Sequence, residues 1–169
     1  MNLMPALAAP PRRFHDFAVG DRMRLGPLFV AHLEAQDFAR RYDPLPFLLS
    51  EEGAADHPLF SRMAASGWLV AALVNRALVE ECLVNPVAVV GQPGVEALRW
   101  IRPVYPGDEL MVEAEVIGTR RLLSRTDLGL VRQRLRVTNA ARQPVMSARL
   151  ALLVEAPPLT QVVQQLVDQ

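Results

Sequence analysis

One segment of the chain is apolar around almost its whole circumference. It covers residues 66–83 and reads SGWLVAALVNRALVEECL. Its clearly polar positions are Ser66, Asn75, Arg76, Glu80 and Glu81. This composition predicts a helix, which the Asn85-Pro86 pair ends. A surface helix has a single apolar stripe, so a helix this apolar is expected to be covered on nearly every side.

From about Gly94 onward, apolar and polar residues alternate with a period of two. The alternation predicts strands over residues 95–102, 110–116, 131–137 and 145–154. Glu113 and Glu115 share one face of the second strand, and three arginines, at positions 132, 134 and 136, share a face of the third. If these strands are antiparallel neighbours, the charges form cross-strand ion pairs, each worth ~0.2–1 kcal/mol when exposed.

The first third of the chain carries weaker signals. A short strand is predicted near residues 27–31 and a helix over residues 33–41. A turn with two prolines follows, and residues 50–56 read as a short helix with Ser50 as its cap. Turns are also predicted at Pro106-Gly107-Asp108 and over residues 139–144.

A long apolar helix followed by a meander of half-buried strands predicts an α+β fold, with an antiparallel sheet wrapped around the helix. We expect one domain over residues 14–156, preceded by a disordered tail over residues 1–13. Residues 157–169 contain apolar positions with helical spacing. A helix this short is marginal alone, so it is expected to dock on the sheet or on a partner subunit.

Composition narrows the class of protein. The chain has 169 residues, of which 51 % are hydrophobic and 21 % charged, as suits one domain with a packed core. Its zero net charge gives no electrostatic argument for nucleic acid or an anionic membrane as partner. All 18 basic residues are arginine, which excludes lysine chemistry. The longest apolar run is too short to cross a bilayer, so a soluble, cytoplasmic protein is expected.

The single cysteine, Cys82, excludes an intramolecular disulfide and any cysteine metal cluster. Its neighbours are apolar and helical, so we interpret it as a small buried hydrophobic residue. Trp100 alternates inward on its predicted strand and is interpreted as a core residue, although Trp100 and Tyr105 are also candidates for a nucleotide-binding rim. The arginine row is interpreted as a solvated, self-paired face and not as a phosphate site.

The candidate chemistry lies in the turn YDPLPFLLSEE, residues 42–52. Asp43 leads a turn braced by two prolines, and that turn then runs into Phe47, Leu48 and Leu49. This turn, the ASGW that opens the apolar helix and the LRWIRPVYPGDEL that opens the sheet occur in an order that resembles the MaoC-like dehydratases. That family has the hot-dog fold and includes the (R)-specific enoyl-CoA hydratases.

The resemblance implies a dimer with an acyl-thioester tunnel near the subunit interface and no cofactor beyond the CoA or acyl-carrier thioester. It also implies hydration of an α,β-double bond, or its reversal, by the pair in Asp-x-Asn-Pro-x-His. Asp43 matches the aspartate and Pro46 the proline, but Leu45 replaces the amide and Leu48 the histidine. Ser66 and Gly67 match the helix start, whose backbone N–H receives the thioester carbonyl. Phe47 and Leu48 would then line the tunnel.

Leucine can neither give nor take a proton, and a positioned acid-base group typically contributes ~10²–10⁴-fold in rate. His15 and His32 are interpreted as structural, and His57 is the histidine closest to a replacement role. Asp43 is either a lone acid-base residue or a relic paired with an arginine such as Arg62.

These residues are compatible with three alternative functions. The first is an acyl-thioester binder with weak or altered hydratase or dehydratase activity through Asp43, a hydro-lyase if active. The second is a catalytically silent subunit that pairs with an active homologue. The third is a hot-dog thioesterase in which Asp43 activates water.

Overall fold

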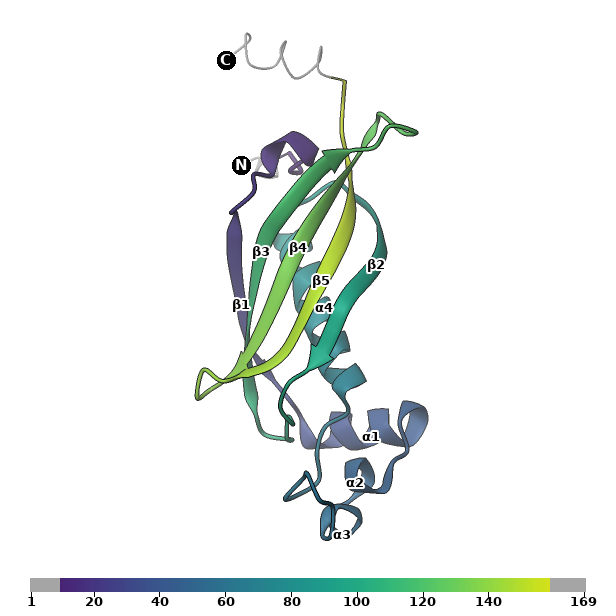
Figure 1. The fold of residues 1–169 in the computed structure, drawn as a ribbon, viewed down its shortest axis with the longest axis vertical. Coiled ribbons are helices and arrows are strands. Elements are labelled where there is room, and N and C mark those ends of the chain that lie inside the picture. Colours follow the sequence, from purple (N-terminus) through teal and green to yellow (C-terminus); the bar gives the residue numbers. More distant parts are fainter. Residues whose placement is uncertain (1–9, 159–169) are drawn as a thin grey trace, which may run out of the picture.

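The computed structural model describes residues 10–158 of the chain (Figure 1). Five strands form one antiparallel sheet in the spatial order β1-β3-β4-β5-β2. They are β1 (Arg22–Phe29), β2 (Val89–Trp100), β3 (Glu109–Arg121), β4 (Leu128–Asn139) and β5 (Pro144–Glu155). The helices are a 3-10 turn η1 (Phe14–Asp16), α1 (His32–Tyr42), α2 (Pro46–Leu49), α3 (Glu51–Ala54) and α4 (Gly67–Val84). Helices α1 to α3 lie at one end of the molecule, and the described chain begins and ends at the other.

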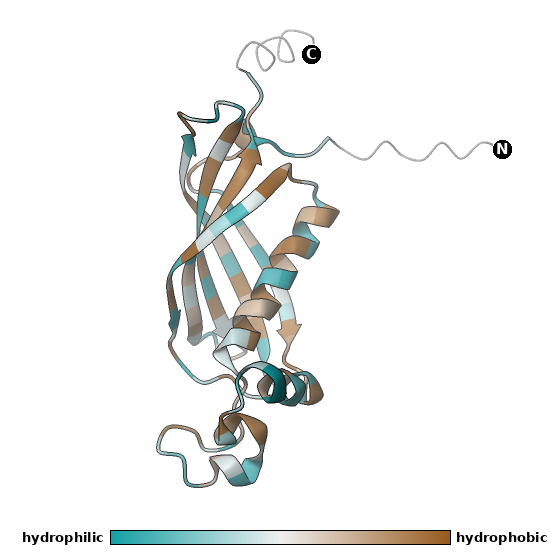
Figure 2. Ribbon diagram, turned by 90° about the vertical axis from the view of Figure 1, so that its right-hand side faces the viewer, coloured by the Kyte–Doolittle hydropathy of each residue, from teal (hydrophilic) through white to brown (hydrophobic). Residues whose placement is uncertain are grey.

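The apolar segment forms α4, as predicted, with Ser66 as its N-cap and Asn85 as its C-cap. α4 lies along one face of the sheet (Figure 2). Its inward side chains pack against the inward rows of β3, β4 and β5, which together form the main core. The members from α4 are Leu69, Val70, Leu73, Val74 and Leu78. Among residues 10–158, no helix is both long and apolar enough to span a bilayer.

The expectation that α4 is covered on nearly every side is wrong for a single chain. Trp68, Val79, Leu83 and Val84 are between 50 % and 76 % exposed. The sheet covers the face of α4 that turns toward it, and no other element of residues 10–158 lies over the outer face along the length of the helix. α4 therefore has a buried apolar face and an exposed apolar face.

The central strands follow the predicted alternation. Leu110, Val112, Ala114 and Val116 of β3 are at most 3 % exposed. The register places Glu113 opposite Arg136 and Glu115 opposite Arg134, as predicted for antiparallel neighbours.

The outer face of the sheet is self-paired. Glu115 lies 3.8 Å from Arg134 and 3.3 Å from Arg22, while Glu113 lies 3.6 Å from Arg24 of β1. Arg132 pairs with Glu96 of β2 at 2.7 Å. The charges on this face thus help to fix the order of neighbouring strands.

The two edge strands are longer than the sequence predicts. β1 starts at Arg22 and not near Pro27, because the stretch before Gly26 pairs with β3 in regular register. β2 starts at Val89, and its register with β5 shifts three times. Pro93 and two glycines interrupt the alternation of β2, and an edge strand tolerates such interruptions where a central one does not.

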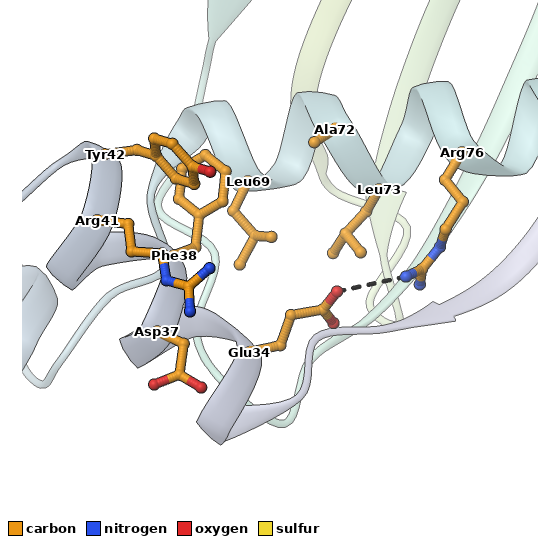
Figure 3. Close-up of a pocket in the computed structure, with 9 residues that line it drawn as sticks. All are labelled: Glu34, Asp37, Phe38, Arg41, Tyr42, Leu69, Ala72, Leu73 and Arg76. Carbon is orange, nitrogen blue, oxygen red and sulfur yellow. Dashed lines mark hydrogen bonds and ion pairs between the residues drawn. The ribbon is translucent and has the colours of Figure 1, made fainter.

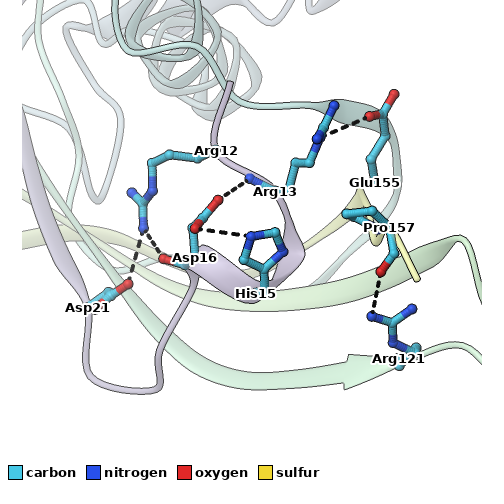
Figure 4. Close-up of polar contacts among 8 residues, drawn as sticks. All are labelled: Arg12, Arg13, His15, Asp16, Asp21, Arg121, Glu155 and Pro157. Carbon is cyan, nitrogen blue, oxygen red and sulfur yellow. Dashed lines mark hydrogen bonds and ion pairs between the residues drawn. The ribbon is translucent and has the colours of Figure 1, made fainter. Parts of the chain in front are cut away.

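Residues near the described N-terminus contact the sheet, although they fall within the predicted tail. The Arg12 N–H donates to the Pro86 oxygen at 2.7 Å, and the Arg12 side chain pairs with Asp21 at 3.2 Å (Figure 4). Arg13 lies 3.6 Å from Glu155 at the end of β5. The helix predicted from residue 159 onward lies outside the described residues.

The alternation on β3 yields a stability prediction. Leu110 is fully buried and Met111 is 40 % exposed on the opposite face. Leu110→Ala should lower the free energy of unfolding by about 2–5 kcal/mol, because it removes buried methyl groups and leaves a cavity. Met111→Ala, the matched control, should change it by about 0.5 kcal/mol or less. Chemical denaturation measures both. Equal losses would contradict the described orientation of β3.

Candidate active site

Asp43 lies where α1 ends. Its backbone N–H donates to the Ala39 oxygen at 3.0 Å, and its own oxygen accepts from the Leu45 N–H at 2.8 Å. Pro44 cannot continue the helix, and Pro46 is the first residue of α2, a position that proline favours. These constraints fix the backbone on both sides of Asp43 and so restrict where its carboxylate points.

Ser66 lies opposite Asp43 and is almost fully buried, at 1 % exposure. The segment that leads to it is held by two backbone hydrogen bonds, from the Ala64 N–H to the Phe47 oxygen and from the Ala65 N–H to the Val104 oxygen. The Ser66 Oγ accepts from the Trp68 N–H at 3.2 Å and donates to Asp43 Oδ2 at 2.7 Å. One hydroxyl therefore joins the candidate carboxylate to the start of α4.

Asp43 opens into a cavity of about 490 Å³, which we call the Asp43 cavity. Its wall contains four of the five predicted site residues: Asp43, Phe47, Leu48 and Gly67. The fifth, Ser66, contacts this wall through its hydrogen bond to Asp43. Most of the remaining wall is hydrocarbon, from Leu45, Leu59, Phe60, Val70, Val104 and Val145. The sequence-predicted residues thus converge on one mainly apolar cavity.

Leu48, which the resemblance matches to the motif histidine, lies on the wall of this cavity and is 4 % exposed. It packs in a small cluster with Ala39 and Ala64. The position therefore faces the site, but its side chain has no proton to exchange.

His57 does not stand in for the missing histidine in the cavity wall. Its ring stacks on Phe60, with centroids 4.4 Å apart, and meets Phe47 in a tilted arrangement at 4.3 Å. Its Nδ1 accepts the Leu59 N–H at 3.2 Å. The imidazole is thus held in an aromatic stack beside the wall. Of the other histidines, His15 lies 3.4 Å from Asp16 and His32 starts α1.

Two tryptophans line the cavity: Trp68, which the sequence analysis did not single out, and Trp100, which it interpreted as a core residue with a binding rim as the alternative. Trp100 is 46 % exposed and is not a core residue. It meets Trp68 edge to face, with ring centroids 4.9 Å apart. A side chain on Gly67 would overlap the Trp100 indole, so this glycine permits a close approach of the ring to the helix start. The Gly67-Trp68 pair at the start of an apolar helix was the sequence signal from which this role could have been predicted.

The arginine pairing considered for Asp43 does not occur. Arg62 lies 3.9 Å from Asp108, and its guanidinium stacks over the Tyr105 ring at 4.4 Å. Arg102 is the arginine in the cavity wall, and its Nη1 donates to the Pro144 oxygen at 2.8 Å. Asp43 therefore has a neutral hydroxyl as its partner in the structure.

A slightly larger cleft of about 530 Å³ lies between α1 and α4 (Figure 3). Its rim carries Glu34, Asp37, Arg41 and Arg76, and Glu34 pairs with Arg76 at 3.3 Å. It contains none of the residues that the sequence singles out. We therefore assign the candidate site to the Asp43 cavity despite its smaller volume.

Comparison with known proteins agrees with this geometry. The family model for MaoC-like domains matches residues 19–139. The chain belongs to the MaoC-like domain family. A solved MaoC-like dehydratase of Rhodospirillum rubrum is 37 % identical, covers 87 % of this chain and 99 % of its own, and superposes with a TM-score of 0.77.

Two further solved structures extend the comparison. An (R)-hydratase of Pseudomonas aeruginosa is 28 % identical over 86 % of each chain, with a TM-score of 0.63. A conserved Mycobacterium tuberculosis protein with a double hot-dog fold is 22 % identical, with a TM-score of 0.68 over 88 % of this chain and 45 % of its own. The expected α+β hot-dog fold of this MaoC-like protein is therefore confirmed.

The shared hydroxyl can be tested by a double-mutant cycle. Ser66→Ala should lower the free energy of unfolding by about 0.5–2 kcal/mol through loss of the helix cap alone. Combined with Asp43→Ala, it should show a coupling energy of about 1 kcal/mol or more, because the two side chains share one hydrogen bond. Ser50→Ala removes the cap of α3 and should be additive with Asp43→Ala. Additivity in both cycles would contradict the Ser66–Asp43 bond.

Proposed function

We propose that this MaoC-like protein binds an acyl thioester in the Asp43 cavity and that Asp43 is its acid-base residue. The reaction class is hydration of an α,β-double bond or the reverse dehydration, which makes the protein a hydro-lyase. The observation that supports this most directly is the Ser66 hydroxyl, which bonds both Asp43 and the start of α4. It keeps a carboxylate and a helix N-terminus beside the same apolar cavity.

Asp43 is suited to proton transfer because its orientation is fixed. Hydration needs a base that takes a proton from water and an acid that gives one to the α-carbon. Ser66 holds Oδ2, and this contact also sets the direction of Oδ1. Asp43 is only partly buried and lies in the wall of the cavity, so substrate and water reach it.

The start of α4 is suited to the thioester oxygen. The first N–H groups of a helix have no partner within that helix, and the helix dipole favours negative charge there. The Trp68 N–H is bonded to the Ser66 hydroxyl, whereas Gly67 lies in the cavity wall. We assign the Gly67 N–H to the thioester carbonyl, where such a donor is typically worth ~10²–10³-fold in rate.

Leu48 makes this acid-base pair incomplete. The protein should therefore be a weak or altered hydratase, since one positioned proton-transfer group contributes ~10²–10⁴-fold. Leu45 and Leu48 enlarge the apolar share of the wall, which suits a hydrocarbon chain. The wall contains no lysine or histidine that would take over the second role.

The exposed apolar residues support a partner subunit. β2 is an edge strand, its Val90 and Val95 are 55 % and 51 % exposed, and Val95 lines a space that Trp68 of α4 also lines. An edge strand with an apolar surface is a pairing site, and a patch of this kind marks an interface. We propose a homodimer or a heterodimer with a homologous hot-dog chain. The same exposed apolar surface supports the second candidate function, a catalytically silent subunit of such a heterodimer.

Turnover of a short and a medium-chain trans-2-enoyl-CoA tests the proposal. The purified protein alone should consume the conjugated double bond slowly, and Asp43→Ala should reduce that rate by ~10²-fold or more. Loss of ultraviolet absorbance measures it. Slow turnover that Asp43→Ala leaves unchanged would remove Asp43 from the reaction. Thioester binding without turnover would favour the silent subunit, and release of free thiol would favour the thioesterase.

The identity of residue 48 provides a gain-of-function prediction. Leu48→His restores a proton-transfer group on the wall beside Asp43 and should raise the hydration rate by ~10-fold or more. Leu59→His places the same side chain on the same cavity at a position that is 77 % exposed, and it should leave the rate unchanged. Thermal unfolding of both variants checks that they fold. An equal effect of both histidines would contradict the assignment of position 48.

A further inference from the structure

A second cavity, of about 350 Å³, lies under the C-terminal half of α4. Its wall comes from that helix, from β1, β2, β4 and β5, and from the segment before β1. It shares no lining residue with the Asp43 cavity. Much of the wall is apolar, with Phe17, Met23, Leu78, Leu150 and Leu152 among its members. We call it the Gln133 cavity, after the residue that sets it apart.

Gln133 is the polar member of an otherwise apolar row. Its neighbours on the inward face of β4 are Val131 and Leu135, which are 0 % and 4 % exposed. Gln133 itself is 2 % exposed, and its Oε1 has no hydrogen-bond partner among residues 10–158. Buried polar groups nearly always have a partner, so an unpaired carboxamide on a cavity wall indicates that something else pairs with it.

Three more carboxamides line the same cavity: Asn75 of α4, Asn85 at its C-cap and Gln92 of β2, and the Asn85 amide already donates to Glu81 at 2.6 Å. Together with Gln133 they offer neutral donors and acceptors from three different elements. The charged residues on the wall are Arg12 and Glu81, and Arg12 is already bonded to Asp21 and to the Asp16 oxygen. Asn75 and Gln92 lie at exposed positions, so Gln133 is the buried polar residue of this wall, and its surroundings are apolar and uncharged.

We propose that the Gln133 cavity binds the end of an elongated apolar molecule that carries an uncharged hydroxyl, whose O–H donates to Gln133 Oε1. The apolar wall suits the body of such a molecule, and Gln133 Oε1 accepts the hydrogen bond from its hydroxyl. A volume of about 350 Å³ corresponds to roughly a dozen water molecules, which is enough for a chain of comparable size. A purely hydrocarbon chain would displace water and leave Gln133 unpaired.

Two sources of this chemistry fit the structure. A smaller space of about 150 Å³ lies between the two cavities and shares Asn75, Leu78 and Gln92 with the Gln133 cavity. It also includes Trp68, which lines the Asp43 cavity. The ligand is thus either the oxygenated tail of an acyl thioester or a separate molecule. The site itself rests on the cavity and Gln133, and does not depend on hydration at Asp43.

Cys82 gives the experiment its readout, because it is the single cysteine of the chain and lines the Gln133 cavity. Its side chain is half-buried, whereas the sequence predicted a buried one. Burial, with a smaller contribution from the negative charge of Glu81, raises the pKa of its thiol. Alkylation should therefore be followed at alkaline pH, and Cys82→Ser confirms that the signal comes from this residue.

The experiment compares 10-hydroxydecanoate with decanoate as protectants of Cys82 against alkylation. The hydroxylated acid should protect at a concentration roughly tenfold lower, because its hydroxyl pairs with Gln133. Gln133→Leu should abolish that preference while decanoate still protects. Gln143→Leu, the same replacement in the turn between β4 and β5, should leave the preference unchanged. Thermal unfolding checks that both variants fold.

In the unmodified protein, the proposal is overturned if the two acids protect Cys82 equally or if neither protects it. This outcome needs no variant. A preference that survives Gln133→Leu would overturn the role of Gln133. Repeating the comparison with the two CoA esters distinguishes the sources. Protection by the esters with the same preference supports an acyl tail, and protection by the free acids alone supports a separate ligand.

Discussion

The hydrogen bond between Ser66 and Asp43 is the contact on which the geometry of the candidate site depends. Asp43 belongs to the turn after α1, and Ser66 belongs to the segment before α4, 23 residues later. The same hydroxyl accepts the Trp68 N–H, so movement of the turn also disturbs the first turn of the helix. The proposed acid-base group and the proposed oxyanion donor are thus positioned by one atom.

That hydroxyl also explains how a carboxylate is kept beside so much hydrocarbon. A carboxylate loses water when apolar side chains surround it, and it needs hydrogen bonds in compensation. With Leu48 in place of a histidine and Arg62 turned toward Asp108, Ser66 supplies such a bond at 2.7 Å. A neutral donor orients Asp43 without supplying a second proton-transfer group, which is why the site combines an ordered carboxylate with incomplete chemistry.

The sequence predicted the alternation of the central strands, although β3 and β4, like the edge strands, extend beyond their predicted bounds. β3, β4 and β5 each have one face against α4 and one face in water, so the period of two is clear. β1 and β2 have fewer constraints, because one side of each has no neighbouring strand. Gly26 and Pro93 interrupt their patterns without ending the strands.

The site residues also divide into those that a local motif located and those whose role depends on distant parts of the chain. A motif located Asp43, Leu48, Ser66 and Gly67, because residues close in sequence to a fixed turn or cap keep their geometry. Trp100 was misjudged because alternation places it on a face but does not say whether that face ends in core or at a cavity. Alternation places Gln133 on the inward face between Val131 and Leu135, but only the folded structure shows that its Oε1 is buried without a partner among residues 10–158.

α4 lines both cavities, and its outer apolar face is left incompletely buried by a single chain. A helix that is apolar all round is destabilised unless its outer face is also covered, and a single chain leaves Leu83 and Val84 about three-quarters exposed. Val95 of the edge strand β2 and Trp68 of α4 line one space, so one partner surface would cover strand and helix together. Such a partner would also enclose the space between α4 and β2, which joins the surroundings of Trp68 to those of Gln133. With such a partner, coverage of the helix and closure of these spaces would be the same physical event.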